Sequence, residues 1–104
     1  FRDPVQPDPT GLRKWLTGPG ARQRLEAAVN HFHSDRSELD EQEAEATVNR
    51  VAEIMGTSRA PVIHTIRVAV TGMTVGAGLF ETLAVLGRPT VIRRLRRALE
   101  WVVD

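Results

Sequence analysis

The residues best suited to binding chemistry lie in the C-terminal half of the chain, beginning at His64 and Arg67. Arg67 and Thr71 are four residues apart, and His64 comes three residues before Arg67. In a helix these spacings put the three side chains on one face, pointing toward the mouth of the glycine-rich segment that follows. An arginine in that place can read a nucleic-acid base through a bidentate hydrogen bond or through stacking. A salt bridge to a neighbouring acid is the alternative, and the pattern does not decide between the two.

A glycine-rich segment separates two apolar stretches, and we call residues 72–78 the glycine elbow. It contains Gly72, Gly76 and Gly78, and a helix can start directly after it at Leu79. Glycine allows positive φ and lets a ligand approach the backbone closely, and unpaired N–H groups at a helix N-terminus can donate to a base edge or a phosphate. An ordinary turn between two helices would use the same glycines. No parallel strand precedes the segment, so it is not a dinucleotide-binding fingerprint.

Two further features are candidates for contact with nucleic acid. Phe80 could stack on an unpaired base, although a phenylalanine in such a helix could equally enter the core. The apolar stripe of the last predicted helix should face the core, which leaves four arginines on its remaining surface: Arg93, Arg94, Arg96 and Arg97. They could hold phosphates and make binding sensitive to salt. Alternatively they form a solvated face that pairs with the acidic segment 35–53, at about 0–1 kcal/mol for each surface pair.

The sequence contains no recognisable set of residues for catalysis. Its histidines are His31, His33 and His64, and there is no cysteine. His31 and His33 are two residues apart and would point to different sides of a helix, so we interpret them as exposed polar residues near a helix end. No H-E-x-x-H motif or cysteine pair supplies further zinc ligands. We therefore predict no catalytic residue, no metal site and no cofactor in this chain.

Length and charge are consistent with one small binding domain. The chain has 104 residues and a formal net charge of +1, which is one domain's length. The charge is distributed unevenly, because residues 35–53 contain seven acids and two arginines, whereas residues 54–104 contain seven arginines and three acids. Such asymmetry lets one face meet a polyanion. No run of about 18 apolar residues could span a membrane, and the lack of cysteine is consistent with the cytoplasm.

The remaining patterns predict an all-α fold, a small bundle of five to six helices. Residues 1–10 contain three prolines and should form an extended lead-in or linker, followed by a helical domain over residues 11–104. Residues 66–70 are rich in β-branched side chains and taken alone could form a strand, but no partner strand is visible, so we predict a helix there. Apolar spacing predicts a short helix after Thr10 and further helices over residues 21–32, 38–55, 58–71, 79–86 and 89–102.

Residues 62–99 combine several motifs in a fixed order. They are Arg67-x-x-x-Thr71-Gly72, then Gly78-Leu79-Phe80-Glu81, then Leu86-Gly87 and a basic final helix. This order resembles the C-terminal end of bacterial glutamyl-tRNA synthetases, and a weaker similarity extends back to Asp3. In that family a proline often precedes the Gly-Leu-Phe, where this chain has Ala77. Without the proline the loop is less stiff, which raises the entropic cost of ordering it on binding.

The resemblance implies an anticodon-binding domain of the class I aminoacyl-tRNA synthetase type. The chain begins at Phe1 rather than at a methionine, and we expect it to be a piece of a longer enzyme that ligates glutamate to its tRNA with ATP and Mg²⁺. Its partners would be the tRNA anticodon loop and the upstream domains of the same chain, in a monomeric cytoplasmic enzyme without membrane contact. By similarity, the second and third anticodon bases would meet Arg67 and the loop of Gly76, Ala77, Gly78, Leu79 and Phe80, with Thr71 and His64 beside them.

Two other functions are compatible with the sequence. One is a helical protein-interaction or structural module whose basic helix docks on an acidic partner. The other is a small helical DNA-binding domain that reads with residues 89–102, although such domains usually dimerise. Salt-dependent binding of anticodon-loop RNA would favour the anticodon-binding domain, and sequence-selective binding of duplex DNA would favour the last alternative.

Overall fold

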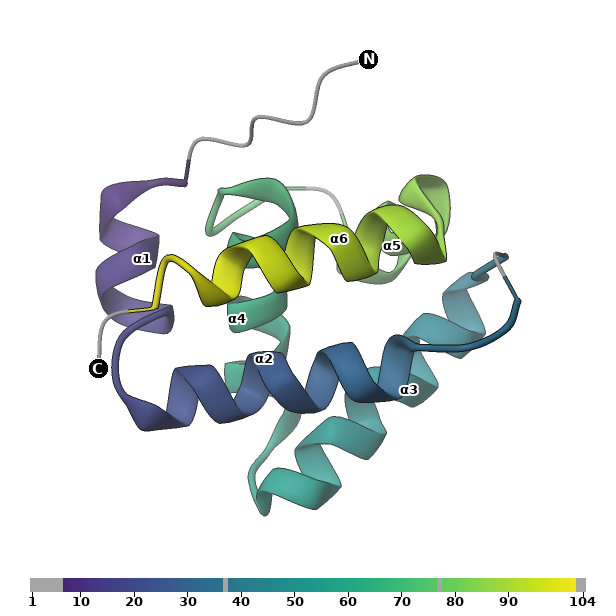
Figure 1. The fold of residues 1–104 in the computed structure, drawn as a ribbon, viewed down its shortest axis with the longest axis horizontal. Coiled ribbons are helices and arrows are strands. Elements are labelled where there is room, and N and C mark those ends of the chain that lie inside the picture. The colour runs from purple at the N-terminus through teal and green to yellow at the C-terminus, as the bar shows by residue number, and fades with distance from the viewer. Residues whose placement is uncertain (1–6, 37, 77, 103–104) are drawn as a thin grey trace.

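The computed structural model describes residues 7–36, 38–76 and 78–102, and this part of the chain contains helices and no strand (Figure 1). The predicted all-α bundle of five to six helices is therefore confirmed. Of these helices, none combines the length and the apolar character that a bilayer span requires. The helices are α1 (Pro9–Trp15), α2 (Pro19–Phe32), α3 (Glu41–Met55), α4 (Arg59–Thr71), α5 (Leu79–Leu86) and α6 (Arg88–Leu99).

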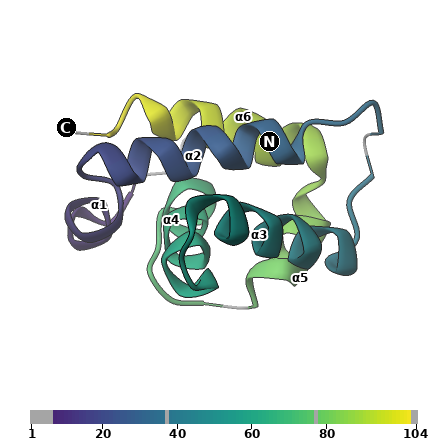
Figure 2. The ribbon, with the colours of Figure 1, turned by 90° about the horizontal axis from the view of Figure 1, so that it is seen from below.

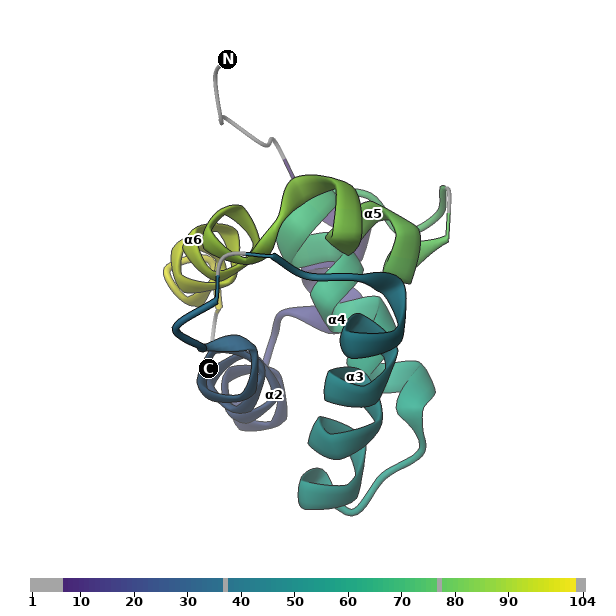
Figure 3. The ribbon, with the colours of Figure 1, turned by 90° about the vertical axis from the view of Figure 1, so that its right-hand side faces the viewer.

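The helices surround one apolar core. α2 and α6 lie side by side, and α4 packs against both of them (Figures 1 and 2). α3 packs against α2, α4 and α5, while α1 packs against α4. Figure 3 shows α2 and α6 nearly end-on, on the opposite side of the molecule from the glycine elbow. The largest fully buried side chains include Leu16, Leu25, Phe32, Ile66, Leu83 and Leu95.

The first helix begins slightly earlier than predicted because its cap lies earlier. α1 starts at Pro9, in the first turn where proline is tolerated. Asp8 caps this helix, since its Oδ2 accepts a hydrogen bond from the N–H of Gly11 at 3.1 Å. Pro9 and Thr10 thus belong to a helix, although the sequence placed them in the lead-in. Residues 1–6 lie outside the described residues, and the predicted division at residue 10 stays a prediction.

The third and last helices also differ from the prediction at their ends. α3 starts at Glu41 rather than at residue 38, because Asp40 and Glu43 form a capping box. The Asp40 side chain accepts from the Glu43 N–H at 2.7 Å, and the Glu43 side chain accepts from the Asp40 N–H at 3.0 Å. α6 ends at Leu99 instead of 102, but Val102 is still buried as predicted.

The β-branched residues 66–70 form part of α4, as predicted. Ile66, Val68 and Val70 are all buried, and α4 is packed against α1, α2, α3 and α6. The burial of these side chains outweighs the small helix-propensity cost of β-branching. Ser58 occupies the N-cap position without a side-chain cap bond, and Gly72 ends the helix in the left-handed conformation with φ 76°.

One polar contact joins α2 to α4 inside the bundle. Thr65 is fully buried, and its hydroxyl accepts a hydrogen bond from Nε of Arg24 at 2.8 Å. The Thr65 hydroxyl in turn contacts the carbonyl of Trp15 at 3.4 Å. Burial lowers the pKa of Arg24, but a guanidinium keeps its charge in proteins. This contact ties the end of α1, α2 and α4 together behind the outward face of α4.

Candidate nucleic-acid interface

The outward face of α4 carries three of the predicted binding residues. His64, Arg67 and Thr71 are partly accessible, whereas Thr65, Val68 and their neighbours on the other face are buried. The helix therefore presents His64, Arg67 and Thr71 along one edge of the core, as their spacing predicted. Arg67 is half-buried there, one turn before the glycine elbow begins.

Thr71 connects α4 to the glycine elbow through its hydroxyl. The Thr71 Oγ1 donates to the carbonyl of Arg67 at 2.7 Å and accepts from the N–H of Met73 at 3.1 Å. Both bonds are local, so the hydroxyl is occupied in shaping the start of the elbow. The structure thus gives Thr71 a positioning role next to Arg67.

The start of the elbow is also held against α1, a contact that the sequence did not indicate. The N–H of Asp8 donates to the carbonyl of Gly72 at 2.7 Å. A Cβ atom on Gly11 would lie 2.8 Å from Cγ2 of Thr74 and 3.1 Å from Cγ2 of Val68. Only glycine permits this approach without displacement of the elbow. A glycine in the middle of a short helix was the one available signal.

The tip of the elbow is open to solvent. Val75 is 72% exposed and Met73 53% exposed, and nothing lies within 4 Å of a Cβ built on Gly76, whose φ is 150°. Ala77 lies outside the described residues. Gly78 has φ −53° and does not need glycine for its conformation. Exposed apolar side chains on an open backbone can cover the face of an unpaired base.

The end of the elbow is anchored in the core through Leu79. Leu79 is 4% exposed, so this residue belongs to the core and offers a ligand almost no surface. Phe80 is half-buried, and its ring centroid lies 5.5 Å from the guanidinium carbon of Arg59. Arg59 comes eight residues before Arg67, about 12 Å along the axis of α4. The ring is therefore held by a cation–π contact away from Arg67.

His64 differs from the expectation that it points toward the mouth of the elbow. Its ring stacks on the ring of Trp15, with centroids 4.6 Å apart and an angle of 19° between the planes. Trp15 ends α1, whereas it is Gly11, a turn earlier, that meets the elbow. The sequence could not show this contact, because Trp15 and His64 are far apart in the chain. Arg67 and Thr71 remain as the α4 side chains next to the elbow.

The comparison with protein families decides the identity of this fold. The family model described as an anticodon binding domain matches residues 1–99. The chain belongs to the anticodon binding domain family. Its relatives include a glutamate–tRNA ligase of Moorella thermoacetica, 38% identical over 102 residues, with 98% of this chain and 21% of that protein covered.

Two further relatives have similar coverage. A glutamate–tRNA ligase of Desulforudis audaxviator is 34% identical over 105 residues, with 98% of this chain and 21% of that protein covered. One of Thermobifida fusca is 37% identical over 97 residues, with 93% and 20% covered. This anticodon binding domain therefore spans about a fifth of the length of the curated relatives that it matches.

The arginines of α6 in this anticodon binding domain are not all on the surface. Arg94 is only 7% exposed, and its Nη1 donates to the carbonyl of Val70 at 2.9 Å. The prediction of a solvated arginine face is therefore wrong for Arg94, which falls between the buried Val91 and Leu95. Arg93 and Arg96 are exposed, as predicted. Arg97 is half-buried, with its guanidinium carbon 5.3 Å from the ring centroid of Trp101.

Two glutamates on α3 of the anticodon binding domain form ion pairs with arginines that do not belong to the run at residues 93–97. Glu43 pairs with Arg36 at 2.8 Å, and Glu45 pairs with Arg59 at 3.0 Å. The four side chains are at least a quarter exposed, so each pair contributes about 0–1 kcal/mol. Within the described residues, no three His, Asp or Glu side chains come close enough together to hold a metal ion.

Proposed function

We propose that this anticodon binding domain reads the anticodon loop of a tRNA as part of a glutamate–tRNA ligase. The observation that carries the proposal is the position of Arg67, on the outward face of α4 and one turn before an open glycine elbow. The names of the relatives support glutamate as the amino acid and tRNA as the partner. A planar guanidinium beside a loop of exposed backbone suits the edge of an unpaired base.

Each element of the proposed site has a distinct role. Arg67 contacts a base through its guanidinium, and the exposed backbone of Gly76 and Gly78 offers N–H groups to a second base. Thr71 holds the first residues of the elbow in place through its two local hydrogen bonds. His64 supports the surface indirectly by stacking on Trp15. Phe80 is assigned to the edge of the site, where its ring contacts Arg59.

The rest of the proposed enzyme supplies the chemistry. We assign ATP, Mg²⁺ and the transfer of glutamate to the upstream part of a monomeric, cytoplasmic parent, and we assign no catalytic step to this chain. The packing of α6 argues against the alternative of a DNA-reading helix, because α6 contacts α2, α4 and α5. Two of its arginines, Arg88 and Arg94, are used inside the protein.

Substitution of Arg67 tests the proposal directly. We expect Arg67→Ala to weaken binding of the cognate anticodon stem-loop by about 1–3 kcal/mol, the cost of losing a good base contact. Arg67→Lys should lose most of the same affinity, because an ammonium cannot form the bidentate fork. Dissociation constants are measured for the cognate stem-loop and for stem-loops with changed anticodons.

The matched control is Arg50→Ala, which removes an exposed arginine from α3. This variant should bind every stem-loop as the unaltered chain does. An equal loss for all loops in Arg67→Ala would mean that Arg67 contacts only phosphate. Unchanged affinity in that variant would reject the role of Arg67 altogether.

A further inference from the structure

A basic groove lies between the end of α2 and the first half of α6. It has a volume of about 510 Å³ and is open to solvent. The described residues that line it include four arginines and no carboxylate: His33, Ser34, Arg36, Arg88, Pro89, Ile92, Arg93 and Arg96. We call it the α2–α6 groove. Its composition favours an anionic ligand.

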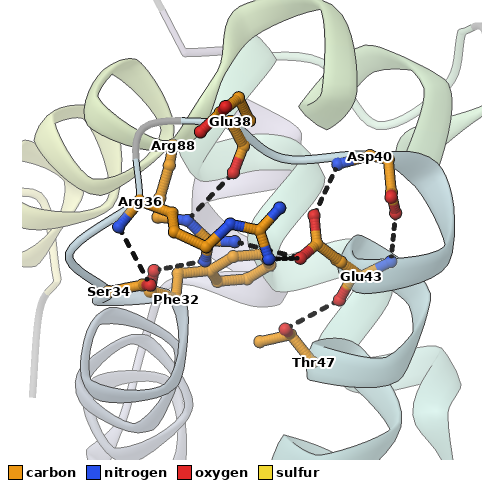
Figure 4. Close-up of polar contacts among 8 residues, drawn as sticks. All are labelled: Phe32, Ser34, Arg36, Glu38, Asp40, Glu43, Thr47 and Arg88. Atoms are coloured by element: carbon orange, nitrogen blue, oxygen red, sulfur yellow. Dashed lines mark hydrogen bonds and ion pairs between the residues drawn. The ribbon is translucent and has the colours of Figure 1, made fainter.

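The inner wall of the groove is a guanidinium that the fold holds in place. Arg88 is 6% exposed. Its Nη1 donates to the carbonyl of Phe32 at 2.7 Å, and its Nε donates to the carbonyl of Glu38 at 3.2 Å (Figure 4). Glu43 lies 3.9 Å from Nη2 of the same side chain. These contacts fix the chain after α2 against the start of α6, so the groove is formed before any ligand arrives.

Further positive charge lies along the outer edges of the groove. Arg93 and Arg96 are exposed and three residues apart, so they share one face of α6. Arg36 faces them from the chain after α2, with its side chain 60% exposed while pairing with Glu43. Against these arginines Glu43 supplies one negative charge, and Figure 4 shows it on the α3 side of Arg36 and Arg88. The groove therefore keeps a net positive charge.

The α2–α6 groove is lined from the end of α2 and from α6, and these two helices lie on the opposite side of the molecule from the glycine elbow (Figure 3). A loop whose bases contact the elbow cannot place those same nucleotides in the groove. The groove must therefore bind a different part of a ligand from the part that the elbow binds, and its arginines would recognise that part by its negative charge. Arginine forks match phosphate oxygens in pairs, and they do so for any base sequence.

We propose that the α2–α6 groove is a second RNA-binding site, which binds backbone phosphates without reading bases. The proposal rests on the proposed function only in taking RNA as the partner of this domain. Arg93 and Arg96 contact phosphates directly, and Arg36 exchanges part of its contact with Glu43 for the ligand. Arg88 is a positioning residue that shapes the groove.

Binding of an oligouridylate to the full chain tests this site, with a double variant Arg93→Gln and Arg96→Gln. Both side chains are exposed, so the fold should be retained. We expect about ten-fold weaker binding and a salt slope that is smaller by about one to two, since two phosphate contacts are lost. The matched control, Arg13→Gln with Arg50→Gln, removes two exposed arginines outside the groove and should bind as the unaltered chain does.

The same measurement separates this proposal from the role of Arg67. Arg67→Ala should leave oligouridylate binding within about two-fold while it removes discrimination among anticodon loops. The second RNA site is overturned if the double variant binds oligouridylate with unchanged affinity and salt slope. It is also overturned if the double variant loses binding of poly-glutamate but keeps binding of oligouridylate, because the groove would then serve an acidic protein.

Discussion

The glycine elbow and the α2–α6 groove are built by different means. The elbow is held mainly by hydrogen bonds from main-chain N–H groups. The N–H of Asp8 donates to the carbonyl of Gly72, and the N–H of Met73 donates to the hydroxyl of Thr71. The side chains exposed along it, such as Val75, are apolar. The groove is lined by arginines, and the innermost one, Arg88, is buried and bound to two carbonyls.

This difference separates two kinds of recognition. An open backbone with small residues can adjust to the edge of one base and reject others, at an entropic cost. A preformed row of guanidinium groups binds phosphates, which are the same in every sequence. We therefore expect damage to the anchor of the groove to affect the whole fold, and damage to the elbow to affect selective binding more than stability.

The largest effect is expected from Arg88→Ala. The substitution leaves the carbonyls of Phe32 and Glu38 without their donor and leaves Glu43 with one cation fewer, so the free energy of unfolding should fall by about 2–4 kcal/mol. Urea denaturation followed by circular dichroism measures this. Arg93→Ala, one turn further along α6 and exposed, should change stability by no more than about 0.5 kcal/mol. Equal losses in the two variants would contradict the anchoring role of Arg88.

A smaller effect is expected where the elbow meets α1. Gly11→Ala places a Cβ atom 2.8 Å from Cγ2 of Thr74, and overpacking of this kind costs about 1–3 kcal/mol. The clash should outweigh the gain of about 1 kcal/mol that alanine brings to a helix. Unfolding by urea and binding of the cognate stem-loop both report it.

Thr74→Ser removes the clashing methyl group and serves as the control for this contact. The double variant Gly11→Ala with Thr74→Ser should recover part of the stability lost in Gly11→Ala, as expected for residues in direct contact. Strict additivity of the two changes would show that α1 and the elbow do not constrain each other.

The smallest effect on stability is expected from Thr71→Val. The hydroxyl bonds to Arg67 and Met73 are lost while the shape of the side chain is kept, so the free energy of unfolding should fall by about 1 kcal/mol. Binding of the cognate stem-loop should weaken as well, because the elbow is no longer held at its first residues. Thr71→Ser keeps the hydroxyl and should retain the binding. If valine and serine variants bind alike, the hydroxyl does not position the elbow.

Much of the fold could be predicted because its signals are local. Asp40 and Glu43 form the capping box of α3 within three residues of each other. In α4 the apolar spacing correctly outweighed the β-branched run at residues 66–70. The position of Arg67 on the outward face followed from the same spacing, since a helix places residues four apart on one side.

The parts of the site that could not be predicted depend on contacts between distant segments. Arg94 belongs to an arginine run, and its burial depends on contacts outside α6, such as its hydrogen bond to the carbonyl of Val70 on α4. Arg88 is similarly fixed by a carbonyl at the end of α2. His64 meets Trp15 because α1 packs across α4. No spacing within one helix carries that information.

The sequence by itself determined the order of the helices and the face of α4 that carries Arg67, because apolar period and capping residues act within a few positions of each other. Only the tertiary structure decided which arginines face solvent and which are buried, since this depends on the carbonyls that neighbouring helices bring to them. It also decided that the elbow lies on the opposite side of the domain from α2 and α6, because α4, which leads into the elbow, packs against both of these helices.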